Sequence, residues 1–493
     1  MNSLKKRLLL IVLILIISIT GCSQNSTDEE TQQNIETTET NVEIDSLPAE
    51  EYIYPDIDGE GTDFRVLNST TEWGFYTNLV LDEMTGDILD DAIYIRNRFI
   101  EDKFNINIKE IPVNIDSTAD QLRRSITAGD DEYDAAFCPA FSAVPIGTLI
   151  VGNFFYNQKD IPTLNFEKNW WNQTMNKEAA IGKGEKLYYS GSEINIMALQ
   201  TVACLFFNQD MMINLGLDLP YNAVREGKWT LELFDQYLKS AANLNGDESF
   251  NWTANGHATY GFTAMENSVA ALVAGFGECI IKTDSDGNPY LAIDTEQFVN
   301  AANKAAEILY DKSKFLPTDR AVECIYEAEF MKGRTLMIID ELRGADIFRD
   351  LDATFGLLPM PKYNENQENY YCLPIFQTPV LVIPSTNSRP DFTGIILDAW
   401  AYVSSVDVTP VFFDVAVSQK QLRNQDSIDM LQIMKNSGSF EVGCAYGWTT
   451  EFYNDFRNTL GAAKEYNIVS KIESAKDGIA IRIVDTMQFF DEE

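Results

Sequence analysis

Hydrophobic positions beyond the N-terminal region follow two periods in turn, which predicts alternating strands and helices. Apolar stretches predict strands at 64–67, 106–108 and 133–137. Between them, apolar residues at helical spacing predict helices at 90–104 and 117–129. An order of strand, helix, strand, helix, strand implies a largely parallel sheet that is covered on both faces, so the pattern predicts an α/β fold.

Later segments repeat this order without a tandem repeat of fixed length. Ser117 with Asp120 is typical of a capping box at the start of the second helix. Thr230 is expected to cap a later helix, and Asp294 with Gln297 to cap a longer one. Further apolar stretches predict strands at 335–339, 354–358 and 380–383.

The first 22 residues have the pattern of a secretory signal. A short basic region precedes the apolar run Leu8–Ile19, which is short for a membrane span and ends at small residues. The sequence from Ile19 to Cys22 resembles the bacterial lipobox, whose cysteine is diacylated and becomes the first mature residue. By that resemblance Cys22 carries the lipid anchor. A plain signal peptide and an uncleaved anchor are the alternatives, and no later stretch is predicted to cross a membrane.

Residues 23–61 have the composition of a flexible, acidic tether. They are rich in Thr, Gln, Asn and acids, contain no Lys or Arg, and hold few large apolar side chains. Such a segment cannot bury enough surface to offset the entropy lost on ordering. We expect it to hold a globular body away from the membrane surface.

Charge and motif content exclude several functions. The formal net charge of −38 argues against binding nucleic acid or polyanions. The six cysteines outside the lipobox are scattered singly, without C-x-x-C spacing, which favours buried free thiols over disulfides or zinc. His257 is the only histidine, and no phosphate loop, Gly-x-Ser-x-Gly or His-Glu-x-x-His motif is present. We therefore expect no metal, no cofactor and no enzymatic activity.

Three stretches resemble one known family when taken in order behind the lipobox. The stretch 202–210, followed by 216–220 and 227–230, resembles the apolar strand, "YNKDL" and "GL…P…TW" segments of family 1 extracellular solute-binding proteins. The stretch 330–337 is similar to that family's helix-to-strand junction, and 355–363 to its "G-x-x-P-x-P" turn. This maltose-binding-protein-like family serves ABC importers. The subgroup that the chain resembles most contains long lipoproteins of Gram-positive gut bacteria.

The resemblance implies a two-lobed periplasmic-binding-protein-like fold of type II, in which each lobe is a mixed sheet flanked by helices and hinge strands join the lobes. The expected segments are listed here: lobe 1 at 62–200 and 384–418, lobe 2 at 201–375 and 419–493, and a hinge near 200–206 and 376–384. Sheets of this kind bind ligands at the carboxyl ends of their strands. The loops after Leu67, Phe137 and Ile339 are therefore expected to face the cleft.

A sugar presents flat apolar faces and rims of hydroxyls, which aromatic rings and planar polar groups bind. Candidates come from three places: these loops, a possible entry to the cleft, and a Gly-flanked C-terminal segment where the resemblance implies an aromatic platform. They are Glu72, Trp73, Trp171, Asp340, Glu341, Arg343, Tyr446 and Trp448. Some have a structural alternative: loop packing for Trp73, core packing for Trp171, and capping with an internal ion pair for the residues at 340–343, where the resemblance implies ligand contact. Trp229, Trp252 and Trp400 are expected to be structural.

The resemblance implies a lipid-anchored monomer on the outer face of the cytoplasmic membrane of a Gram-positive cell. It would capture a small solute and deliver it to ABC permease subunits. A neutral oligosaccharide is the preferred ligand, and a peptide comes second. A surface hydrolase needs only two suitably spaced carboxylates, so with 75 acidic residues it stays an alternative. A sensor that signals to a membrane receptor is the third possibility.

Overall fold

The computed structural model divides the chain into residues 1–51 and a second unit, 52–493. The residues that it describes are 52–71, 77–142, 144–284, 286–348, 351, 353–374, 378–418 and 425–492. The signal segment, Cys22 and most of the predicted tether lie outside the described residues. The fold described below is that of the second unit.

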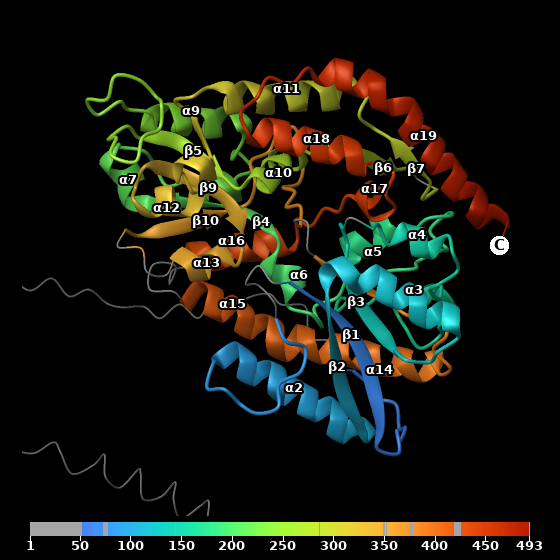
Figure 1. Cartoon of the computed structure of the whole chain (residues 1–493). Helices are drawn as coiled ribbons and strands as arrows, with labels where there is room; N and C mark the ends of the chain where they lie inside the picture. Colours follow the sequence, from blue (N-terminus) through green and yellow to red (C-terminus); the bar gives the residue numbers. More distant parts are fainter. Residues whose placement is uncertain are drawn as a thin grey trace, which may run out of the picture. The chain divides into compact units, whose positions relative to one another are not determined.

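A four-stranded sheet forms the core of what we call the first half (Figure 1). Its order is β11-β3-β1-β2, with β1 parallel to β2 and β3, and β11 antiparallel to β3. The predicted parallel sheet is thus confirmed for its first three strands. The strands are β1 (Thr62–Thr70), β2 (Ile106–Asn114), β3 (Ala135–Pro139) and β11 (Pro379–Val382).

Helices cover both faces of this sheet, because its strands bury side chains on both sides. Phe64 and Val66 pack with α2 and α14, whereas Leu67 packs in the cluster that contains Leu122 of α3. The helices of this half are α2 (Ile88–Phe104), η1 (Ile115–Ser117), α3 (Thr118–Ala128), α4 (Gly147–Ile150), η2 (Gln158–Asp160), α5 (Gln173–Ala179), α6 (Met197–Gln200) and α14 (Pro390–Val403).

One helical stretch differs from the sequence expectation about membrane spans. Among the described residues, Pro390–Val415, which runs from α14 through η6 (Ser404–Val408) into α15 (Thr409–Ser418), is long and apolar enough to cross a membrane. Many of its apolar side chains are buried, and Ile396 and Trp400 are fully buried in the core beside the first sheet, although Val406 is exposed. The high hydropathy of this stretch therefore reflects its place in the core.

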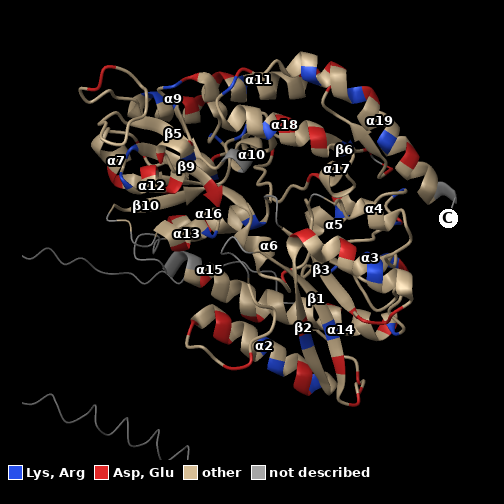
Figure 2. Ribbon diagram, in the orientation of Figure 1, with Lys and Arg blue, Asp and Glu red and all other residues tan. Residues whose placement is uncertain are grey.

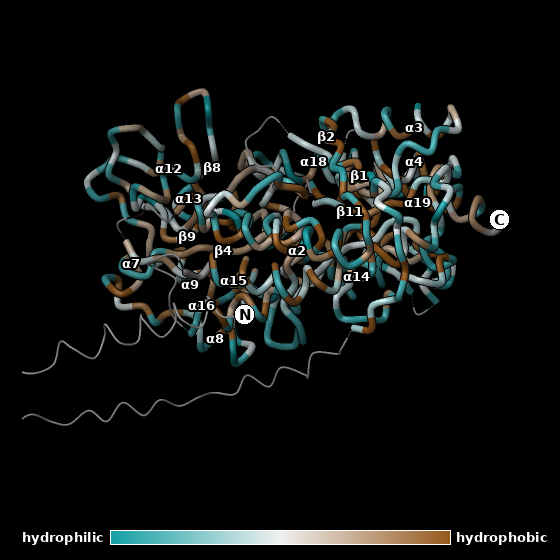
Figure 3. Tube along the Cα trace, turned by 90° about the horizontal axis from the view of Figure 1, so that it is seen from below, coloured by the Kyte–Doolittle hydropathy of each residue, from teal (hydrophilic) through white to brown (hydrophobic). Residues whose placement is uncertain are grey.

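A five-stranded sheet forms the core of the second half, with strand order β10-β4-β9-β5-β8. β5 is parallel to β8 and β9, and β4 is antiparallel to β9 and β10. These strands are hydrophobic along most of their length (Figure 3), because both faces are covered. They are β4 (Ala203–Asn208), β5 (Tyr260–Ala264), β8 (Phe315–Pro317), β9 (Thr335–Glu341) and β10 (Phe355–Leu358), beside a separate hairpin of β6 (Ile281–Thr283) and β7 (Pro289–Leu291).

The helices of the second half come from the middle and the end of the chain. Acidic side chains lie on helices of both halves with basic ones between them, so the negative charge is spread widely (Figure 2). The helices are α7 (Gln209–Asn214), α8 (Tyr221–Arg225), α9 (Leu231–Ala241), η3 (Glu266–Val269), α10 (Ala270–Gly275), α11 (Glu296–Tyr310), η4 (Arg320–Val322), α12 (Tyr326–Met331), α13 (Gly344–Ile347), α16 (Gln425–Lys435), α17 (Val442–Ala445), α18 (Thr450–Gly461) and α19 (Ile468–Glu492).

Two neighbouring segments carry the chain between the sheets. Val202 forms an antiparallel bridge with Pro374, and the hydroxyls of Thr201 and Thr378 are hydrogen-bonded at 2.7 Å. The amide of Ala203 donates to the carbonyl of Leu373. The first crossing segment overlaps the predicted hinge near 200–206. In the second, Thr378 lies within the range predicted near 376–384, and Leu373 and Pro374 lie just before it. The lobe boundaries themselves stay a prediction.

The described chain begins by packing against the first half. The Tyr52 ring stacks on Tyr402, with ring centres 4.9 Å apart, and meets Trp170 edge-on. The Tyr54 ring meets Phe99 of α2 edge-on at 5.4 Å. The tether was predicted to cover 23–61. Tyr52 and Tyr54 lie within that range but are packed against the body, so the prediction is wrong for these residues.

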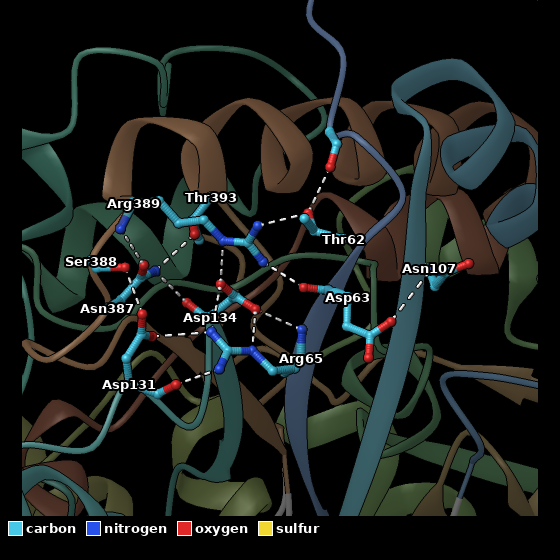
Figure 4. A network of polar contacts seen from close by, with 11 residues as sticks. Thr62, Asp63, Arg65, Asn107, Asp131, Asp134, Asn387, Ser388, Arg389 and Thr393 are labelled. Carbon is cyan, nitrogen blue, oxygen red and sulfur yellow. Dashed lines mark hydrogen bonds and ion pairs between the residues drawn. The ribbon is translucent and has the colours of Figure 1, made fainter.

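A buried carboxylate ties three segments of the first half together (Figure 4). The fully buried Asp134, just before β3, accepts hydrogen bonds from the backbone and the guanidinium of Arg65 on β1. It also accepts from Nε of Arg389, the residue before α14, at 2.8 Å. Arg389 in turn donates to Thr62 and to the carbonyl of Asp63. One carboxylate thus fixes β1, β3 and α14 relative to each other.

Helix caps differ from those expected. Ser117 precedes α3 and Thr230 precedes α9, but neither side chain makes a capping hydrogen bond. The cap of α11 is Thr295 rather than Asp294, because the Thr295 hydroxyl accepts from the amide of Phe298 at 3.2 Å. The predicted end of α3 at Gly129 is confirmed, since Gly129 has φ +77°. At α11 the sequence pattern placed the cap one residue too early, at Asp294, because Asp294 and Thr295 are adjacent and both residue types cap helices.

Replacing Thr295 by alanine is expected to lower the free energy of unfolding by about 1 kcal/mol, the usual value of a lost N-cap. The cost arises because the amide of Phe298 loses its acceptor. Denaturant unfolding measures it. Ser117→Ala is the matched control, since the exposed Ser117 makes no capping bond, and it should stay within about 0.5 kcal/mol of the parent. Equal losses in both variants would contradict the assignment.

The thiol prediction is confirmed. Cys138, Cys204, Cys279, Cys324, Cys372 and Cys444 are all free, and all but Cys279 are buried.

Candidate functional site

Loops from both sheets meet at Gln200, the last residue of α6. The hydroxyl of Thr77, which follows β1 in the chain, donates to the Gln200 side chain at 2.8 Å. The amide of Arg343, which follows β9, donates to the Gln200 carbonyl at 3.1 Å. Two of the three loops expected to face the cleft are thus held beside the first crossing segment. Sequence analysis missed Gln200, although its place next to the predicted hinge was a usable signal.

The end of β9 carries two buried carboxyl groups. Glu341 forms an ion pair with Arg343, so the internal ion pair considered from the sequence is present. Asp340 does not cap α13; one of its oxygens accepts from the amide of Glu341 at 2.8 Å. Its other oxygen has no hydrogen-bond partner among the described residues. Burial raises the pKa of Asp340 well above its usual value, and burial also raises the pKa of Glu341 against the opposing effect of Arg343.

A cluster of five aromatic residues, which we call the aromatic junction, joins the two halves. Phe141 and Tyr189 belong to the first half: Phe141 follows β3, and Tyr189 precedes Ser190, which pairs with β11. Phe440, Tyr446 and Trp448 come from the segment around α17. Phe141 stacks on Phe440 at 5.6 Å, Tyr189 lies 5.9 Å from both Phe440 and Tyr446, and Tyr446 stacks on Trp448 at 4.7 Å.

The junction is buried in this conformation. The indole N–H of Trp448 donates to the hydroxyl of Thr486 on α19 at 2.8 Å. The hydroxyls of Tyr189 and Tyr446 are buried and have no hydrogen-bond partner among the described residues. An unsatisfied buried hydroxyl costs about 1–3 kcal/mol, so these two groups favour a state in which they meet a partner.

Two glutamates lie beside the junction. The Glu178 carboxylate, on α5, accepts from the amide of Phe440 at 2.7 Å. The Glu441 carboxylate accepts from the amide of Ile280 at 2.8 Å and from that of Gly443 at 3.3 Å. Burial raises the pKa of Glu178 to about 7 and that of Glu441 to about 8. Hydrogen bonds from these backbone amides oppose the shift without cancelling it.

Backbone contact between the halves is close at two glycines. A Cβ on Gly147, the first residue of α4, would lie 2.5 Å from the Cα of Tyr446 and 2.9 Å from its carbonyl oxygen. A Cβ on Gly447 would lie 2.8 Å from the Pro145 ring. The loop after β3 thus packs directly on the Tyr446 segment, because neither glycine presents a side chain.

A groove also runs between α5 and the turn of the β6–β7 hairpin. Its volume is about 750 Å³, and its lining mixes lysines, carboxylates and amides, among them Lys177, Asn176 and Asp284. Within the described part of the chain no three His, Cys, Asp or Glu side chains are arranged to hold a metal ion.

The remaining candidates lie elsewhere. Glu72 and Trp73 are outside the described residues. Trp171 is 1 % exposed and donates its indole N–H to Asp398, which Trp170 also contacts. It lies in the core of the first half rather than between the halves, so we leave it out of the proposed site. Trp229 and Trp400 are fully buried, as expected of structural residues, and Trp252 is partly exposed.

The fold can now be compared with those of known proteins. No family model and no curated protein matches the chain. Solved structures do match: an ABC substrate-binding protein from Listeria monocytogenes in complex with cycloalternan has 13% identity and a TM-score of 0.53, over 85% of this chain and 98% of that one. The chain has the fold of this binding protein. A cyclo/maltodextrin-binding protein complexed with maltotetraose has 14% identity and a TM-score of 0.53, over 88% and 98%.

The similarity extends to a third structure, the protein RafE from Streptococcus pneumoniae, at 14% identity and a TM-score of 0.51, over 87% of this chain and 100% of that one. The predicted fold class is therefore confirmed. This is the two-lobed solute-binding-protein fold, with a mixed sheet and flanking helices in each half and paired segments joining the halves. The first two of these structures are named as binding proteins.

Proposed function

We propose that the protein is an extracellular solute-binding protein that captures a neutral carbohydrate or oligosaccharide between its halves and delivers it to an ABC-type importer. The observation that carries the proposal is the aromatic junction, in which rings from both halves meet beside buried carboxyl groups. Structures with the same fold were solved with cycloalternan and with maltotetraose.

The chemistry of the junction suits a sugar. When the halves part, Tyr189, Tyr446 and Trp448 offer flat faces for the apolar side of a pyranose ring. Glu178 and Glu441 accept hydrogen bonds from hydroxyls. Closure would exclude water and strengthen each of these bonds.

A second set of polar groups lies at the crossing segments. Asp340, Glu341, Arg343 and Gln200 offer acceptors and donors from the β9 loop and from α6, and the sequence-based candidates Glu72 and Trp73 complete the proposed set. We assign these six to the rim of the site. The acidic body disfavours phosphorylated ligands.

The same proposal includes the cellular location of the protein, its lobe boundaries and its partners. Cys22 would be acylated, and 23–61 would connect it to the body, on the outer face of the cytoplasmic membrane of a Gram-positive cell. Lobe 1 would comprise 62–200 and 384–418, and lobe 2 would comprise 201–375 and 419–493. The protein would act as a monomer, without catalysis, and would dock on ABC permease subunits.

A thermal-shift screen against neutral oligosaccharides tests the proposal. A sugar that binds only the folded state stabilises it by about 2.7 kcal/mol at a concentration of 100 Kd, so at least one library member should raise the melting temperature. The same sugars, labelled and incubated with the protein, should stay intact. Cleavage would favour the surface hydrolase instead. A flat response to every sugar, with a shift from peptides, would overturn the ligand class.

A further inference from the structure

Two carboxyl groups, one from each half, lie on either side of the Phe440 backbone at the aromatic junction. Glu178 belongs to the first half and accepts a hydrogen bond from the amide of Phe440. The next residue, Glu441, accepts from the amide of Ile280, directly before β6 in the second half. The bond from Phe440 to Glu178 therefore joins the halves, whereas the bond from Ile280 to Glu441 lies within the second half beside it.

Neither the Glu178 nor the Glu441 carboxyl forms an ion pair with a described Lys, Arg or His, and Glu441 is 3 % exposed. The Glu178 carboxyl adds to the effect of burial and raises the pKa of Glu441 further. The ionisable groups that interact electrostatically with them are Lys177 on α5, Tyr189, Cys279, Cys444 and Tyr453, and the two cysteines also interact with Glu278, Lys282 and Arg457.

The ionisable groups around Glu178 and Glu441 change their charge in a different pH range from the two glutamates. Burial raises the pKa of Tyr189, Tyr453, Cys279 and Cys444 above the usual values, so all four stay neutral near pH 7. Lysine and arginine stay charged there. The two glutamates are therefore the groups at this contact whose charge changes around neutral pH.

We propose that Glu178 and Glu441 form a proton-dependent latch, which holds the halves together when it is protonated and releases them when it is ionised. The latch rests on the proposed function, because it would regulate ligand affinity through closure of the same site. It adds a property that the proposed function does not require.

The direction follows from proton linkage. Separation of the halves would return the carboxyls to water, where the pKa of Glu is about 4.3. The closed form holds its protons up to a pH of about 7 to 8. Closing therefore takes up protons between about pH 4.3 and about pH 8. Protonation favours closure fully below about pH 4.3, and this contribution is lost as the pH rises through about 7 to 8.

The buried thiols supply a readout that needs no ligand. Cys444 lies at the junction, whereas Cys138 lies within β3 of the first sheet. The full-length protein in detergent would be treated with a disulfide reagent at pH 5.5 and at pH 8.5, and mass spectrometry would follow both sites. Normalising each rate to that of the same cysteine in denatured protein removes the pH dependence of the thiol itself. Cys138 reports global unfolding.

We expect the Cys444 rate, relative to that of Cys138, to rise at least about tenfold between the two pH values, as one pKa unit of linkage implies. Glu178→Gln and Glu441→Gln, which keep the shape and an acceptor, should each reduce the rise, and the double variant should abolish it. Glu278→Gln is the matched control, because Glu278 pairs with Lys282 within the second half, and it should keep the full rise.

A relative rate that does not change with pH in the parent protein would overturn the latch, as would an unchanged rise in the double variant. Because no sugar is present, these outcomes are separate from the proposed function. A clear pH response in a protein that binds no oligosaccharide would support the latch and contradict the proposed ligand class.

Discussion

Replacing Asp134 by alanine is expected to lower the free energy of unfolding by about 3–5 kcal/mol, the usual cost of removing one partner from a buried ion pair. The Asp134 side chain is fully buried and is held by two arginines whose side chains are 28% and 27% exposed. Without the carboxylate, both guanidinium groups and the amide of Arg65 lose an acceptor in a place that water reaches poorly (Figure 4). Urea unfolding followed by circular dichroism measures the change.

Asp131→Ala is the matched control for this experiment. Asp131 also contacts Arg65, at 3.0 Å, but its side chain is 36% exposed. Solvent screening makes such a pair worth about 0–1 kcal/mol, so this variant should stay close to the parent. If Asp134→Ala cost no more than the control, the network would not hold β1, β3 and α14 together.

Gly147→Ala is expected to weaken oligosaccharide binding by about 5–150-fold, which corresponds to an overpacking cost of about 1–3 kcal/mol. The new Cβ would meet the backbone of Tyr446 at 2.5 Å, and backbone cannot rotate away as a flexible side chain can. Each half can fold with the extra methyl, but the two cannot close fully over a ligand. Calorimetric titration with the sugar that gives the largest thermal shift measures the affinity.

Gly438→Ala makes the same chemical change at the same contact between the halves. Its Cβ would lie 3.6 Å from the nearest atom, the Cβ of Thr174 on α5, which is an ordinary contact distance. This variant should bind as tightly as the parent. Equal affinities for the Gly147 and Gly438 variants would show that Gly147 and Tyr446 do not meet in the bound state.

Local patterns in the sequence were enough to predict most elements near the site. The apolar run at 64–67 and the run at 335–339 became the centres of β1 and β9, because period and burial follow directly from side-chain chemistry. The positions of the loops after these strands followed from the general rule for α/β sheets. Both loops do meet at Gln200, a residue that carries no pattern of its own.

The composition of the junction could not be predicted in the same way. Phe141, Tyr189 and Phe440 stand in short stretches that mix apolar and polar residues, so sequence alone does not separate a ring between two halves from a ring inside one. Trp171 shows the reverse case, since it was a candidate for the binding site, whereas the structure buries it with Asp398 as the acceptor of its indole N–H. Glu178 and Glu441 have no local mark among 75 acidic residues. Their contacts join residues far apart in the sequence, 262 positions for Glu178 with Phe440 and 161 for Glu441 with Ile280.

The packing of Tyr52 and Tyr54 on the first half has a mechanical consequence. A chain attached to a membrane through its N-terminus would transmit every restraint to α2, Tyr402 and Trp170, and none directly to the five-stranded sheet. The first half would then be the stationary half. The second half, which the anchored segment does not restrain directly, would be the half that moves during capture and release.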